Sequence, residues 1–105
     1  MELEAIVCIV ERGRANDVVH KAVEAGAGGA TIFFGRGSGE TTFSFFHSLK
    51  VESAKEVIII IVTQDKRAAV VEAMVEAARV EENGRGVLFT VPVNEIRGIK
   101  LCSAS

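Results

Sequence analysis

The chain has 105 residues, of which 49% are apolar and 25% charged, and its formal net charge is −2. This length suits one domain, and the composition is that of a globular protein with a real apolar core. A net charge so close to zero gives no broad attraction to nucleic acid or to anionic lipid, so neither is expected as a partner. Residues 1–105 are therefore predicted to form a single domain.

The cysteines and the apolar runs bear on the cellular compartment. The two cysteines, Cys8 and Cys102, stand near opposite ends of the chain and in no metal-binding spacing. The first residues lack the basic start and the long apolar run of a signal peptide. The longest apolar run, residues 57–62, is far shorter than the ~20 residues that cross a bilayer. These features predict a reduced, cytoplasmic protein.

The first half of the chain predicts a strand, a helix and a second strand. Residues 3–10 and 31–34 are rich in β-branched or aromatic side chains, which is typical of strands. Between them, residues 14–25 carry an apolar stripe at helical spacing, and Gly26 follows as a natural C-terminal stop. The stripe consists of Val18, Val19, Ala22 and Val23.

The second half repeats this pattern. Residues 57–62 and 87–91 predict strands, and a second helical stripe lies between them. Val10 and the four stripe residues of the first half match Val62, Val70, Val71, Met74 and Val75 at one offset of 52 residues. Two βαβ halves with right-handed crossovers predict a ferredoxin-like βαββαβ fold, an α+β sandwich whose two helices cover one face of a four-stranded antiparallel sheet.

The sheet face without helices should be polar, but the sequence makes it apolar. Leu3, Ala5, Val7 and Ile9 share one face of the first strand, and Ile6, Cys8 and Val10 share the other. An exposed apolar sheet face is an aggregation hazard, so we expect another subunit to bury it. The alternative is that loops or the C-terminal segment cover this face within one chain.

Two glycine-rich segments are candidates for binding an anion. Arg36 stands between Gly35 and Gly37, and Arg85 stands between Gly84 and Gly86. Glycines let backbone N–H groups approach an anion closely, and the arginines supply positive charge. Across an oligomer interface the two segments are predicted to form a phosphate-binding cleft. The alternative is that they are tight turns with solvated arginines.

No set of residues predicts catalysis or a metal site. His20 lies on the polar side of the first helix and is expected at the surface, and His47 has no ligand partner at suitable spacing. The connection between the halves, residues of about 36–55, clusters Phe43, Phe45 and Phe46. These aromatics are predicted either to bind a partner protein or to pack locally beneath the connection.

The chain resembles the PII family of nitrogen-regulatory signalling proteins. The resemblance covers nearly the whole chain and is carried by residues 26–31 entering the second strand, by 35–39 at the base of the connection and by 84–93. It implies a homotrimer that binds an adenine nucleotide, ATP, ADP or AMP, between its subunits. The family's protruding loop implies control of a transporter or a metabolic enzyme, and the family is not enzymatic.

The resemblance also implies which residues form the nucleotide site. Carried over position by position, the implied ligands are Thr31, Gly35, Gly37, Gly39, Gly84, Gly86 and Lys100, with Arg36 and Arg85 supplying charge. Two positions depart from the family pattern, because Val87 replaces a phosphate-binding lysine and Gly98 replaces an arginine. These departures favour a different or less phosphorylated adenine nucleotide than ATP. Phe43, Phe45 and Phe46 fall in the partner-binding loop, which is shorter than in typical members.

Two other functions stay open from the sequence. A metal-responsive protein of the divalent-cation-tolerance type has a related trimeric fold, and would need His47 and the cysteines as ligands. A small ferredoxin-like enzyme would place its active site in the same cleft, and would need a general base there. No cofactor is expected to be required for the regulatory function.

Overall fold

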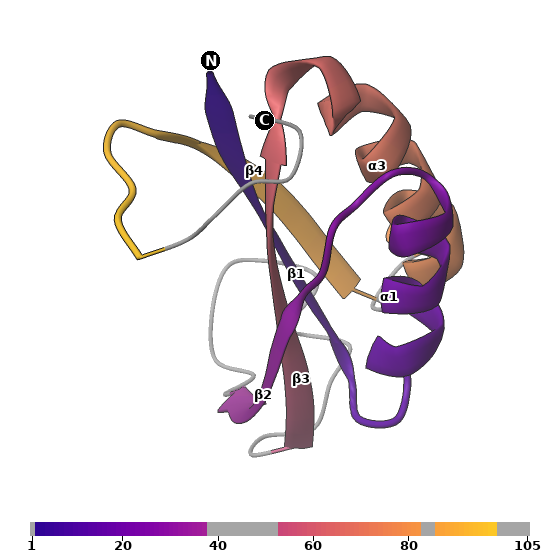
Figure 1. Ribbon diagram of the computed structural model, residues 1–105. Coiled ribbons are helices and arrows are strands. Elements are labelled where there is room, and N and C mark those ends of the chain that lie inside the picture. Colours follow the sequence, from indigo (N-terminus) through magenta and orange to yellow (C-terminus); the bar gives the residue numbers. More distant parts are fainter. Residues whose placement is uncertain (1, 38–52, 83–85, 99–105) are drawn as a thin grey trace.

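A computed structural model of the protein describes residues 2–37, 53–82 and 86–98. The elements follow the order strand, helix, strand, strand, helix, strand (Figure 1). They are β1 (Leu3–Glu11), α1 (Ala15–Glu24), β2 (Thr31–Gly37), β3 (Ser53–Thr63), α3 (Gln64–Ala78) and β4 (Gly86–Val93). The predicted ferredoxin-like α+β fold is confirmed.

The four strands form one antiparallel sheet with the order β2-β3-β1-β4. The strands β1 and β3 therefore lie at the centre, and β2 and β4 lie at the two edges. In the middle of the sheet Val7 of β1 is paired with Ile59 of β3 on one side and with Phe89 of β4 on the other. Both helices lie on the same face of the sheet (Figure 1), so the other face is called the open face below.

The core fills the space between the sheet and the two helices. Ile6, Cys8 and Val10 of β1 are completely buried there, and Ile6 and Cys8 are paired with the buried Ile60 and Ile58 of β3. Residues that correspond in the two halves of the sequence occupy corresponding places in the core. Val18 and Val70, for example, are both fully buried. The members of this core are Ile6, Cys8, Val10, Ala15, Val18, Ala22, Ala27, Ile58, Ile60, Val62, Val70, Met74 and Ala78.

Two members of the predicted helical stripe lie outside the fully buried core. Val19 is partly buried against it, and Val23 is 48% exposed. The reason is direction around the helix axis: at about 100° per residue, Val23 points away from the buried face formed by Ala15, Val18 and Ala22. The predicted stop at Gly26 is confirmed, since this residue adopts a φ of +126° that side chains rarely tolerate.

The strands next to the connection are longer than predicted. The β2–β3 ladder continues through the pairs Gly35–Lys55 and Gly37–Ser53, so the segment between the described strands is 38–52. The predicted partner-binding residues Phe43, Phe45 and Phe46 lie outside the described residues. Within the ranges that the structure describes, neither helix is long and apolar enough to cross a membrane.

The burial of Cys8 leads to a chemical prediction. Burial raises the pKa of the Cys8 thiol to about 12, so the reactive thiolate is scarce at pH 8. In the Cys102→Ser variant, where Cys8 is the remaining thiol, we expect no reaction with a disulfide reagent such as DTNB at pH 8 in native buffer. One thiol per chain should react in denaturant. Full reaction in native buffer would contradict the core described here.

Candidate functional site

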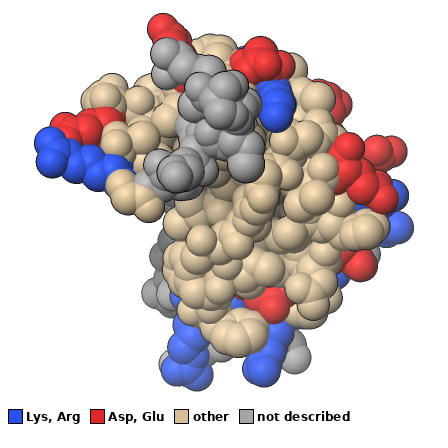
Figure 2. Space-filling view, viewed as in Figure 1, with Lys and Arg blue, Asp and Glu red and all other residues tan. Residues whose placement is uncertain are grey.

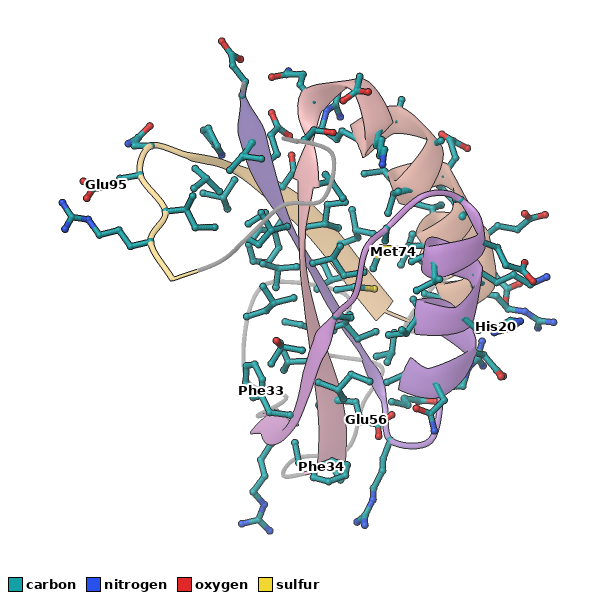
Figure 3. All side chains as sticks on the ribbon, viewed as in Figure 1. His20, Phe33, Phe34, Glu56, Met74 and Glu95 are labelled. Atoms are coloured by element: carbon teal, nitrogen blue, oxygen red, sulfur yellow. The ribbon has the colours of Figure 1, made fainter. Side chains whose placement is uncertain are left out.

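The open face carries a continuous apolar surface. Its centre is formed by Val7 and Ile59, which are half-buried, and its flanks by Phe33 and Phe89, each 47% exposed. Figure 3 shows Phe33 on the side of the sheet away from the helices. In Figure 2 the charged side chains gather around the rim of a broad uncharged area. The expected apolar open face is therefore present, and the described residues leave it partly exposed.

The structure places the described candidate ligands on two edge strands. Thr31, Gly35, Arg36 and Gly37 belong to β2, where Thr31 and Arg36 are exposed. Gly86 is the first residue of β4. The other predicted ligands, Gly39, Gly84, Arg85 and Lys100, lie outside the described residues.

The two glycine segments lie at the same end of the sheet but at opposite edges. One row of paired residues crosses the sheet through Gly86, Val10, Glu56 and Phe34, and Phe34 directly precedes Gly35. Three strand spacings of about 4.8 Å separate the ends of that row, or roughly 14 Å. The described ligand residues of the two segments are therefore not brought together within one subunit.

Lys55 is a buried charge that the sequence analysis missed. It is 2% exposed and lies between Gly35 of β2 and Glu11 of β1 in the sheet register. Burial lowers the pKa of Lys55, and the negative charge of Glu11 opposes this shift. No pattern in the sequence marks this residue, because it falls at the end of the predicted connection, residues 36–55.

Glu56 is a second residue that the sequence analysis missed. Its Oε1 accepts hydrogen bonds from the backbone N–H groups of Gly13 and Ala15, each at 2.9 Å. The residue before α1, Arg14, makes no side-chain cap of its own. The carboxylate of Glu56 therefore caps the first turn of α1 from a neighbouring strand, where negative charge is also favoured by the helix dipole.

Arg12 and Phe34 form a contact at the same end of the sheet. The guanidinium of Arg12 lies 5.2 Å from the centroid of the Phe34 ring. Phe34 is 66% exposed on the helix side of β2, and Figure 3 shows it at the foot of the sheet near Glu56. This contact joins the turn before α1 to the strand that carries Gly35.

Gly86 has a packing role that is independent of any ligand. A Cβ atom at this position would lie 3.0 Å from the carbonyl oxygen of Ile9 and 3.5 Å from a methyl group of Val80. The first contact is with the backbone of the neighbouring strand. A larger residue would push β1 and β4 apart by a few tenths of an ångström, so the close packing of β4 against β1 and Val80 favours glycine here.

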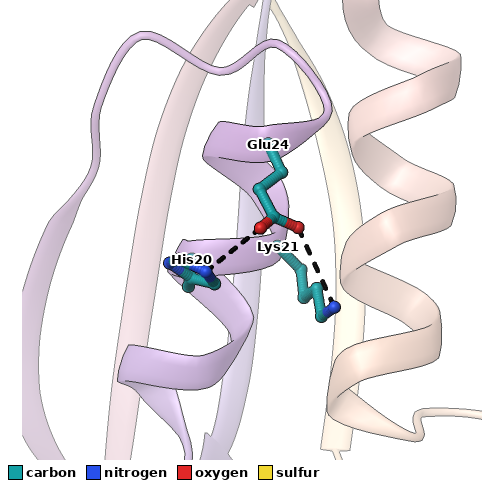
Figure 4. Close-up of polar contacts among 3 residues, drawn as sticks. All are labelled: His20, Lys21 and Glu24. Carbon is teal, nitrogen blue, oxygen red and sulfur yellow. Dashed lines mark ion pairs between the residues drawn. The ribbon is translucent and has the colours of Figure 1, made fainter.

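His20 occupies the surface position that the sequence predicts. Its Nε2 lies 3.1 Å from Oε2 of Glu24, and the other carboxylate oxygen lies 3.8 Å from Nζ of Lys21 (Figure 4). All three side chains are more than half exposed, so this cluster contributes little to stability. It is an ordinary pair of contacts along one helix.

Metal binding finds no support in the part of the chain that the structure describes. Across residues 2–37, 53–82 and 86–98, no group of three or more His, Cys, Asp or Glu side chains is arranged to hold a metal ion. Cys8 is buried among the apolar side chains of the core, and burial raises the pKa of its thiol. This surrounding gives no support for Cys8 as a metal ligand.

The topology defines a small ferredoxin-like α+β domain, and comparison with known proteins identifies its family. The family model described as nitrogen regulatory protein P-II matches residues 3–101. The chain therefore belongs to the PII family, and it is a PII-like regulatory protein. No curated protein matches the chain significantly.

A solved structure of a PII protein agrees with this assignment. The chain is similar to Arabidopsis thaliana PII bound to citrate, with 29% sequence identity and a TM-score of 0.68. The match covers 88% of this chain and 78% of the plant chain. The similarity therefore extends over most of both proteins.

The packing of Gly86 leads to a prediction about stability. We expect Gly86→Ala to lower the free energy of unfolding by about 1–3 kcal/mol, because the new methyl group meets a backbone carbonyl oxygen. Gly28→Ala is the matched control, since nothing lies within 4 Å of a Cβ at Gly28. Urea unfolding of both variants checks the difference. Equal stability of the two would show that the close approach is wrong.

Proposed function

We propose that the protein is a homotrimeric sensor that binds an adenine nucleotide at clefts between subunits. The bound nucleotide changes which conformations of the segment 38–52 are populated, and this segment docks on a transporter or a metabolic enzyme. The pathway proposed is nitrogen control or related metabolic regulation. Membership of the PII family supports this proposal.

One observation carries the proposal. Gly35 on β2 and Gly86 on β4 lie at one end of the sheet but at opposite edges, so they do not form one phosphate-binding turn within a subunit. An oligomer that buries the open face brings the edge of one sheet close to the edge of another. The apolar surface of the open face thus supports the same assembly as the divided site.

The chemistry of the described residues suits an anionic ligand. The buried Lys55, paired with Gly35 in the sheet, provides positive charge on the open face, and Arg36 provides positive charge at the same end of β2 on the helix side. We propose Lys55 as the cation that holds a phosphate group, in a role that Val87 cannot fill. The citrate bound to the plant PII protein is a compact polyanion, which is consistent with an anion site in the family.

Neither alternative function gains a specific observation from the described residues. The metal-responsive hypothesis needs the cysteines as ligands, but Cys8 is buried among the apolar side chains of the core. The enzyme reading needs a general base near the glycine segments, and the carboxylate of Glu56 is already engaged by two N–H groups of the α1 turn. The regulatory function therefore remains the proposal.

The proposed assembly predicts the effect of a charge on the open face. We expect the purified protein to sediment as a trimer, and Ile59→Glu to dissociate it, because a carboxylate at the centre of the buried face would lose its hydration. Sedimentation equilibrium at micromolar concentration measures the mass. The matched control is Val23→Glu, which places the same charge on the exposed part of α1 and should leave a trimer.

A wild-type monomer at these concentrations would contradict the proposed trimer. Dissociation of both variants would show that the effect is general destabilisation rather than loss of an interface. Urea unfolding of each variant separates these two cases.

The proposed ligand is tested by calorimetric titration with ATP, ADP, AMP and a cyclic dinucleotide. We expect one of these to bind with about one site per subunit. Lys55→Gln should then weaken its affinity by roughly tenfold to a hundredfold, as expected for the loss of a charged hydrogen bond. Lys21→Gln is the control, since Lys21 is exposed on α1 and lies near Glu24. Absence of binding to all four ligands would contradict the nucleotide sensor.

A further inference from the structure

The turn between β1 and α1, residues 11–15, contacts both strands that flank the 38–52 segment. On the β3 side, the N–H groups of Gly13 and Ala15 donate to Oε1 of Glu56, as described above. On the β2 side, Arg12 lies against the ring of Phe34. The turn therefore holds the ends of both strands at the base of the first glycine segment.

The same turn also contacts the end of α3. The Nη2 atom of Arg14 donates a hydrogen bond of 3.0 Å to the carbonyl oxygen of Ala77. Ala77 belongs to the last turn of that helix. This carbonyl is one of the acceptors that a helix end leaves without an internal partner. Val80, three residues further, packs beside Gly86 at the start of β4. Arg14 therefore connects the turn to the second glycine segment.

The sheet provides a second connection along the same path. Gly86, Val10, Glu56 and Phe34 form one row across the four strands, and the turn follows directly after Val10 and Glu11. A shift of the turn must therefore disturb the Glu56 hydrogen bonds, the Arg14 hydrogen bond or both. Hydrogen bonds to a carboxylate or from a guanidinium are among the stronger polar contacts in proteins.

We infer that this turn couples the two candidate ligand segments, with Arg14 and Glu56 as positioning residues. What the segments bind rests on the function proposed above, but the coupling between them does not. A disturbance at the Gly86 end makes local opening of β2 at Phe34 and Gly35 more frequent. A disturbance at the β2–β3 end makes local opening of the chain after Ala77 more frequent. Such coupling is reciprocal by thermodynamic necessity.

Hydrogen exchange of the full-length protein without ligand tests this coupling. We expect Arg14→Gln to increase exchange by about tenfold or more at Gly13, at Ala15 and at whichever of Phe34 and Gly35 points its N–H to β3, although the hydrogen bond of Arg14 is to α3 and not to β2. Arg14→Lys, which keeps a cationic donor, should restore part of the protection. Glu56→Gln tests the coupling from the other end. This variant disturbs the β2–β3 end and should increase exchange at residues 76–80 and at Gly86.

The matched control is Arg67→Gln. Arg67 lies in the first turn of α3, where its Nε is 3.4 Å from Oε1 of Glu4 at the opposite end of the molecule. This variant should increase exchange near Glu4 and Arg67 while leaving Phe34 and Gly35 unchanged. A rise in the Arg14→Gln variant that is confined to residues 76–80, or that equals the control at Phe34 and Gly35, would overturn the inference.

A nucleotide titration of the wild-type protein keeps this inference separate from the proposed function. If no nucleotide binds, the proposed nucleotide sensor is wrong. The hydrogen exchange of the variants without ligand still shows whether the two segments are coupled. If a nucleotide does bind, its protection of Phe34 and Gly35 should be smaller in Arg14→Gln than in Arg67→Gln. Equal protection in the two variants would count against Arg14 as a positioning residue.

Discussion

The pairing of β1 with β3 is the constraint on which the rest of the structure depends. These two central strands bury the apolar residues in the middle of their helix side, while the alternate residues form the middle of the open face. Since side chains alternate along a strand, a shift of this pairing by one residue would exchange the two faces. The core, the apolar open face and the position of the glycine segments are all set by this register.

The same register explains why a charged pair sits at one end of an otherwise apolar strand pair. Lys55 and Glu11 face each other where the apolar run of β3 has ended, and Glu56 turns to the other face to cap α1. Two successive residues of one strand thus perform different tasks on the two sides of the sheet. The lysine proposed to hold a phosphate group and the attachment of the first helix therefore lie next to each other in β3.

Much of the fold could be predicted from the sequence because it depends on hydrophobic periodicity. The repeat that relates Val18 to Val70 determined both helices and their buried faces, and the apolar first strand indicated an open face. The site was harder to predict, because its described parts depend on contacts between distant segments. Nothing local in the sequence links Glu56 to Gly13, or Arg14 to Ala77. The exposure of Val23 likewise depends on which side of α1 is turned to the sheet, which apolar spacing alone does not determine.

The internal repeat has a consequence for the order of the chain. The first residue of β1, Leu3, is paired with the last residue of β4, Val93, so the outer ends of the two halves lie side by side. Each half contributes one central and one edge strand, and the strand pairings do not depend on which half comes first. The fold is therefore well suited to circular permutation, in which the half that contains α3 would precede the half that contains α1.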